Sequence, residues 1–157
     1  MKYALLLTGL LLDCTQPPPA GEPTKSAAPS VGETSAVSPA AVDSLANREW
    51  RLAELGEQKN PLGAGGRPIT LRFEEGTRAA GFGGCNRYTG SYTARGDSVS
   101  FGPIASTKMA CTDGMQLEQS YLAMLPLVVR YSLADSILTL MGAGGPVAVF
   151  QAAPGTP

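Results

Sequence analysis

Cys85 and Cys111 are the side chains best suited to chemistry in this chain, since a pair of cysteines can form a disulfide, hold a metal ion or act as a redox centre. A metal site is disfavoured because the chain contains no histidine. A redox centre is disfavoured because the two cysteines do not have Cys-x-x-Cys spacing. We therefore predict a structural disulfide, which would stabilise the fold by roughly 3.5 kcal/mol on the chain-entropy model.

A serine and a lysine could in principle form a hydrolytic pair. Ser106 and Lys108 are two residues apart, but no orienting partner or oxyanion loop is recognisable beside them, and residues two apart on a strand share a face by default. The absence of histidine also removes the commonest general base. We therefore expect no catalytic residue in this chain.

Glycines before the first of the paired cysteines resemble the start of a dinucleotide-binding loop. The sixth position of that pattern is Asn86 rather than glycine, and no helix is expected to follow it. Neither a cofactor nor a metal ion is therefore predicted. Gly81 and Gly84 are instead expected at a bulge or at a close backbone approach, as the docking of a helix would need.

The N-terminal residues indicate export. Lys2 precedes an apolar run over residues 3–12, which is too short to span a bilayer and is typical of a signal peptide within residues 1–14. The following Leu-Leu-Asp-Cys resembles the lipobox of bacterial lipoproteins, which predicts acylation of Cys14; the alternative is an ordinary secretory signal. Residues 15–44 are rich in proline and predict a disordered tether. Export to an oxidising compartment also favours the disulfide.

Residues 45–151 are predicted to form one small domain built mostly from strands. Ile69, Leu71 and Phe73 alternate with polar residues, the period of two expected for a strand with one buried face. Turn residues separate this strand from its neighbours. We predict an α+β fold, a mostly antiparallel, partly closed, β-barrel-like sheet with one packed α-helix. Further strands are expected around Trp50–Leu55, Val99–Phe101, Tyr131–Leu133, Leu138–Leu140 and Ala148–Phe150.

One segment follows a helical pattern instead. Apolar residues fall near helical spacing between 114 and 125, with Thr112 and Asp113 as candidate N-cap residues and Pro126 at the predicted end.

Residues 152–157 are predicted to be a short tail. The chain has 12 basic and 13 acidic residues without a basic stripe, so nucleic acid is not an expected partner.

The motifs GCNRYTGSY and TKMAC, joined to a tryptophan-led first strand and a helix carrying Glu118 and Tyr121, resemble the META domain, the HslJ-like family of bacterial envelope lipoproteins. The resemblance covers about residues 45–150. It implies a compact antiparallel sheet with one helix, and it implies no catalytic residue. The motif residues that it marks, besides Gly81, Gly84 and Glu118, are Asn86, Arg87, Tyr88, Thr107, Lys108 and Met109.

Two structural questions stay open at this level. Asn86 is expected to bond its own backbone or to cap a bulge, and the alternative is ligand binding. Tyr88 and Tyr92 share its face, and they are either core residues with partnered hydroxyls or an exposed recognition platform. The alternation of residues does not decide, because a bulge at the glycines would reset it.

The resemblance and the exported N-terminus together imply a non-catalytic envelope module, linked broadly to stress tolerance and envelope maintenance. We expect it to be an outer-membrane lipoprotein facing the periplasm, a monomer held to the membrane by its N-terminal lipid and binding an unidentified envelope protein or lipid. The alternative is a small-molecule carrier or enzyme inhibitor that uses the open end of the sheet. A hydrolase using Ser106, Lys108 or a carboxylate is a third hypothesis.

Overall fold

The computed structural model describes residues 45, 46 and 48–155. The predicted signal segment 1–14 with Cys14, the predicted tether 15–44 and the last two residues of the tail lie outside the described residues. Within the described part, none of the helices is long and apolar enough to cross a bilayer.

In the described residues, nine strands form one antiparallel sheet in the order β2-β1-β3-β4-β5-β6-β7-β8-β9. An additional antiparallel pairing between β1 and β9 closes the strands into a ring of hydrogen bonds. The link between β6 and β7 is the narrowest of the ring, since it consists of the single pair Ser98 and Arg130. The strands are β1 Glu49–Leu55, β2 Gln58–Lys59, β3 Thr70–Glu74, β4 Arg78–Phe82, β5 Arg87–Arg95, β6 Ser98–Ser106, β7 Arg130–Ala134, β8 Ile137–Gly142 and β9 Gly145–Ala152.

Helical segments connect these strands at two places. The 3-10 turn η1 spans Ala64–Gly66 between β2 and β3. The α-helix α2 spans Met115–Met124 and continues into the 3-10 turn η2, Leu125–Leu127, where Pro126 lies near the start. The predicted α+β class, a mostly antiparallel sheet with one α-helix, is confirmed for the part of the chain that the structure describes.

The alternation of buried and exposed residues along the strands determines which side chains form the core. Leu71 and Phe73 of β3 are buried while Arg72 between them is exposed, as the period of two predicts. The Phe73 ring meets the Tyr92 ring of β5 edge to face, with the ring centroids 4.9 Å apart. Tyr92 is therefore a core residue and does not belong to an exposed platform.

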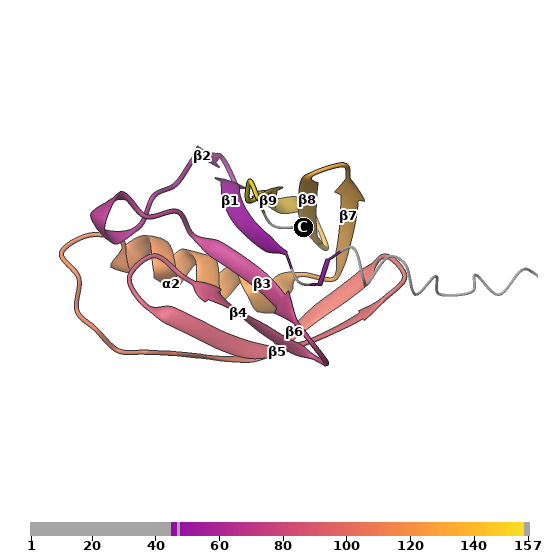
Figure 1. The fold of residues 1–157 in the computed structure, drawn as a ribbon, viewed down its shortest axis with the longest axis horizontal. Coiled ribbons are helices and arrows are strands. Elements are labelled where there is room, and N and C mark those ends of the chain that lie inside the picture. The colour runs from indigo at the N-terminus through magenta and orange to yellow at the C-terminus, as the bar shows by residue number, and fades with distance from the viewer. Residues whose placement is uncertain (1–44, 47, 156–157) are drawn as a thin grey trace, which may run out of the picture. The chain divides into compact units, whose positions relative to one another are not determined.

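The helix α2 packs its buried face against the core formed by the strands. Tyr121 is fully buried, and its ring centroid lies 5.6 Å from that of Tyr88 on β5 and 6.4 Å from that of Phe150 on β9. In the view of Figure 1, α2 lies between β5 on one side and β1 on the other. One side chain of the helix thus joins two strands that are far apart in the sequence.

The helix α2 starts close to the predicted residue 114, but its cap differs from the expectation. Gly114, in the left-handed conformation with φ of 85°, is the N-cap residue, and in the described part of the chain no side-chain hydrogen bond caps the helix. Thr112 and Asp113 are exposed and precede the cap. Glycine is required at the cap, because a Cβ at position 114 would meet the carbonyl oxygen of Gly84 at 2.4 Å.

Candidate functional site

The residues of the first motif form the connection between β4 and β5, and this connection faces the first turn of α2. Glu118 of the helix is buried, and its carboxyl group lies under the connection. Its Oε2 accepts the backbone N–H of Cys85 at 2.9 Å and also the backbone N–H of Asn86. A buried carboxyl group placed this way satisfies two backbone donors that no strand partner reaches.

The side chain of Asn86 continues this network and uses its whole amide group. Its Nδ2 donates to Oε1 of Glu118 at 3.0 Å and to the carbonyl oxygen of Met109 at 3.3 Å. Its Oδ1 accepts the hydroxyl of Thr107 at 2.9 Å and the backbone N–H of Met109 at 2.7 Å. Asn86 therefore joins the β4–β5 connection to both the helix and the segment that follows β6, and the expectation that it bonds its own backbone is wrong.

The glycines of the motif allow the backbones to approach. Gly84 has φ of 138°, and a Cβ there would meet the carbonyl oxygen of Gly114 at 2.8 Å and the backbone nitrogen of Glu118 at 3.1 Å. Gly81 makes a different approach, because a Cβ there would meet the carbonyl oxygen of Thr70 on β3 at 2.0 Å. Gly84 thus brings the helix against the connection, whereas Gly81 fits β4 against β3.

The disulfide joins two of the segments that the hydrogen bonds of Asn86 also connect. Cys85 and Cys111 are bonded, with their Cα atoms 5.9 Å apart. Cys85 is buried in the β4–β5 connection, and Cys111 lies in the segment between β6 and α2. The covalent bond and the Asn86 hydrogen bonds to Met109 therefore hold the same two segments together.

A pair of tyrosines extends the network into the core. The hydroxyl of Tyr88 donates to the carbonyl oxygen of Thr70 at 3.0 Å and lies 2.7 Å from the hydroxyl of Tyr121. Since Tyr88 has one hydroxyl proton and the carbonyl can only accept, Tyr121 donates to Tyr88. Burial raises the pKa of Tyr88 well above its ordinary value, and the neighbouring Tyr121 raises it further. Burial also raises the pKa of Tyr121, partly offset by its hydrogen bond to Tyr88.

Thr70 was not singled out by the sequence. Its carbonyl oxygen accepts from Tyr88, and its Oγ1 accepts the backbone N–H of Phe82 at 3.1 Å. The sequence around Thr70 does not indicate this role, because its hydrogen-bond partners Phe82 and Tyr88 lie 12 and 18 residues later in the chain. The position would be found only by knowing that β3 and β4 are paired.

The remaining motif residues point to the surface. Arg87 is exposed at the start of β5, and Lys108 is exposed after β6, next to Thr107, whose hydroxyl bonds Asn86. Ser106 is half-buried at the end of β6. Ser106, Thr107 and Lys108 line a shallow hollow of about 340 Å³ together with Met109 and Met115.

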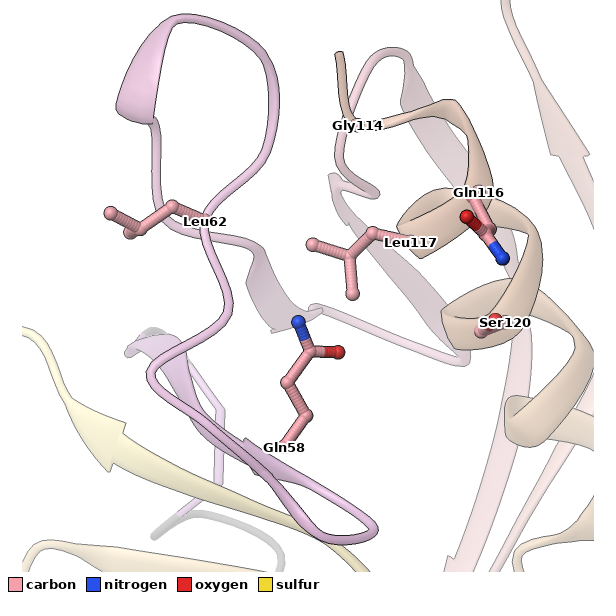
Figure 2. Close-up of a pocket in the computed structure, with 6 residues that line it drawn as sticks. All are labelled: Gln58, Leu62, Gly114, Gln116, Leu117 and Ser120. Atoms are coloured by element: carbon pink, nitrogen blue, oxygen red, sulfur yellow. The ribbon is translucent and has the colours of Figure 1, made fainter.

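Two larger clefts lie beside α2. The first, with a volume of about 400 Å³, separates the helix from the residues between β1 and β3, and it is largely polar. Figure 2 shows Gln58 and Leu117 pointing toward one another across it, with Gln116 and Ser120 on the helix. The second, of about 580 Å³, is mostly apolar and lies between β6 and the helix; it is lined by Phe101, Gly102, Pro103, Ile104, Leu122, Ala123 and Pro126.

The motif residues hold three segments together: the β4–β5 connection, the helix α2 and the segment after β6. In the described part of the chain, every buried polar side-chain atom has a hydrogen-bond partner. Glu118 and Asn86 use their polar atoms on each other and on neighbouring backbone, and the surrounding donors are amides and a hydroxyl. Within residues 45, 46 and 48–155, no three His, Cys, Asp or Glu side chains gather as a metal site would require. We define the Asn86 lock as Asn86, Glu118 and the Cys85–Cys111 disulfide.

The fold and the Asn86 lock define a small antiparallel α+β domain in which one helix is fixed to a closed ring of strands. A model of the META domain matches residues 43–154, and the chain belongs to this family. The predicted family is thereby confirmed.

Solved structures share this fold. An NMR structure of a protein from Burkholderia xenovorans is 29% identical and superposes with a TM-score of 0.61, covering 87% of this chain and 99% of that one. A second NMR structure is 20% identical, with a TM-score of 0.57 and coverage of 70% and 92%. A crystal structure of a DUF4847 family protein from Bacteroides vulgatus is 14% identical, with a TM-score of 0.50 and coverage of 74% and 99%, and it shows the fold alone. None of the curated proteins matches the sequence.

Proposed function

We propose that this chain is a non-catalytic module of the bacterial cell envelope, tethered to a membrane through Cys14, that binds another envelope component and contributes to stress tolerance and envelope maintenance. The observation that carries this proposal is the internal use of the motif. Its polar groups bond one another and the backbone, which leaves the outer surface of the domain for recognition. The domain would act as a monomer on the periplasmic side of the outer membrane.

The polar cleft beside α2 is the proposed binding surface. Gln58 and Gln116 offer amide donors and acceptors, Ser120 offers a hydroxyl, and Leu62 and Leu117 offer apolar contact. The Asn86 lock fixes the helix that forms one wall of this cleft, since Glu118 lies between Gln116 and Ser120 on the same helix. A rigid wall reduces the ordering cost of binding a partner.

Small-molecule carriage is the alternative, and it would use the ring of strands as a partly closed barrel with an open end. Large side chains fill the interior of the ring, and Trp50, Tyr121, Phe73 and Phe150 are almost fully buried there. Space for a ligand remains at the surface clefts beside α2. The packing therefore supports surface recognition of a partner better than storage of a ligand.

The experiment that tests the binding proposal is site-specific photo-crosslinking in living cells. A photo-reactive residue replaces Gln116 in the polar cleft, and the matched control replaces Gln151, an exposed glutamine on β9 outside the cleft. We expect crosslinked products from position 116 and none from position 151. Absence of products at both positions, together with an unaltered envelope when the gene is deleted, would sink the proposal.

The tether has its own test. The mass of the mature protein from native membranes reports cleavage before Cys14, acylation of that cysteine and the loss of two hydrogens in the disulfide. An unacylated Cys14 would overturn the membrane anchor while leaving the binding surface to be judged by the crosslinks.

A further inference from the structure

Two methionines share the hollow beside the Asn86 lock, and both side chains are exposed. Met109 is 59% exposed and Met115 is 49% exposed. Both line the mostly apolar hollow of about 340 Å³. By contrast, Met124 is 8% exposed within the core cluster, and Met141 is half-buried on β8.

The backbone conformation at Met109 and Met115 does not depend on contacts of their side chains. The N–H and the carbonyl oxygen of Met109 both bond the Asn86 side chain, at 2.7 and 3.3 Å. Met115 is the first residue of α2, directly after the Gly114 cap. Neither side chain belongs to the core cluster. A chemical change at either sulfur therefore leaves the packing of the core intact.

The sulfur atoms that can react with an oxidant at this hollow are those of the two methionine thioethers. The neighbouring Cys85 and Cys111 are joined in a disulfide and offer no thiol to an oxidant. Thioethers react by oxygen transfer, and accessibility to the oxidant decides which methionine reacts. Met109 and Met115 are thus the accessible two-electron reductants of this surface.

We propose that Met109 and Met115 form a reversible oxidation site, at which an oxidant of the peroxide or hypohalous acid class converts the apolar hollow into a polar one while the fold stays intact. With hydrogen peroxide, a sulfur lone pair attacks one peroxide oxygen and the O–O bond breaks. The transferred oxygen stays bound to the sulfur, which loses two electrons. The proton of that oxygen passes to the departing hydroxide, which leaves as water, and a sulfoxide remains. This proposal stands independently of the proposed function.

The chemical consequence is a change in the recognition properties of one surface. A sulfoxide oxygen is a strong hydrogen-bond acceptor, whereas a thioether is a weak one. Two sulfoxides beside the exposed Lys108 would turn an apolar, weakly accepting hollow into one that accepts hydrogen bonds. Reductases specific for each sulfoxide epimer would restore the thioethers.

The test treats the full chain with hydrogen peroxide and follows each methionine by peptide mass spectrometry. We expect Met109 and Met115 to oxidise about tenfold faster than Met124, because the buried sulfur reacts only when the core opens. Near-ultraviolet circular dichroism and the emission of buried Trp50 should not change over the same interval. Equal rates at Met109 and Met124, or loss of the native signal as Met109 and Met115 react, would overturn the proposal.

A matched variant isolates the effect on the hollow. The double substitution Met109→Leu and Met115→Leu keeps the apolar character and removes both oxidisable sulfurs. Binding of a hydrophobic fluorescent dye should fall after oxidation of the natural chain and stay constant in the double variant. Recovery of dye binding is expected after treatment with both sulfoxide reductases. An equal fall in the double variant would show that other residues are responsible and would contradict the proposed site.

Discussion

Asn86 and Glu118 are 32 residues apart in the sequence and are joined by two hydrogen bonds, one from the Asn86 backbone N–H to Oε2 and one from Nδ2 to Oε1 at 3.0 Å. The first bond satisfies a backbone donor of the β4–β5 connection, and the second orients the amide so that its oxygen faces Thr107 and Met109. This one pair therefore sets the positions of three segments. It is the centre of the Asn86 lock.

Substitution of Gly84 tests the close approach between the helix and the β4–β5 connection. Gly84→Ala places a Cβ 2.8 Å from the carbonyl oxygen of Gly114, at a φ of 138° that alanine rarely adopts. We expect a loss of about 2 to 4 kcal/mol in the free energy of unfolding, measured by urea denaturation. Gly144→Ala is the matched control, since a Cβ there meets nothing within 4 Å. Equal stability of the two variants would contradict the steric argument.

Reduction of the disulfide should destabilise the domain without erasing the fold. Opening the Cys85–Cys111 bond frees a loop spanning 26 positions, which corresponds to about 3.5 kcal/mol on the chain-entropy model. Because Asn86 still holds Met109 through its amide, we expect native near-ultraviolet circular dichroism at low denaturant. The double variant Cys85→Ala and Cys111→Ala should behave like the reduced protein. An unfolded reduced protein in the absence of denaturant would show that the hydrogen bonds alone are insufficient.

Alkaline pH should unfold the domain because of its buried tyrosine pair. Burial raises the pKa values of Tyr88 and Tyr121 above the ordinary value, so the folded state holds protons that the unfolded state releases. Their contribution to stability is complete below about pH 10 and is lost as the pH rises through the folded pKa values. Above about pH 10, the free energy of unfolding should fall by roughly 1.4 kcal/mol per pH unit for each of the two tyrosines that stays protonated in the folded state.

Phenolate absorbance measures this effect. In the folded protein, Tyr88 and Tyr121 should titrate only together with unfolding, whereas in denaturant all tyrosines should titrate near their ordinary value of about 10. Burial also raises the pKa values of Tyr92 and Tyr131, which should titrate late as well. Normal titration of all four of these tyrosines in a protein that keeps its native circular dichroism would refute the buried hydroxyl pair.

Much of the fold was predictable because its signals are local. The alternation of Leu71 and Phe73 with polar neighbours marks β3, and the helical spacing of apolar residues marks α2. The disulfide was predictable by elimination, since few alternatives suit two cysteines in a chain without histidine. Each of these inferences needs only neighbouring residues or a residue count.

The parts that escaped prediction depend on residues distant in the sequence. Asn86 bonds Glu118, Thr107 and Met109 rather than its own backbone, and no local pattern encodes those partners. The helix starts where the sequence predicts, but its cap is Gly114 rather than Thr112 or Asp113. Glycine is required at this cap because the carbonyl oxygen of Gly84, from another segment, lies against it. The sequence predicts a partly closed sheet, but no short-range pattern identifies β1 and β9 as the pair that closes the ring.

The Asn86 lock is tested most directly by exchanging its amide and its carboxyl group. In Asn86→Asp two carboxyl groups face each other across the 3.0 Å contact, and we expect a loss of about 3 to 5 kcal/mol in urea unfolding. In the double variant Asn86→Asp and Glu118→Gln, the new amide on the helix donates to the new carboxylate, while the amide oxygen accepts both backbone N–H groups. The double variant should recover at least about half of that loss as coupling energy. Additive losses in the double variant would contradict the claim that this pair locks the helix to the sheet.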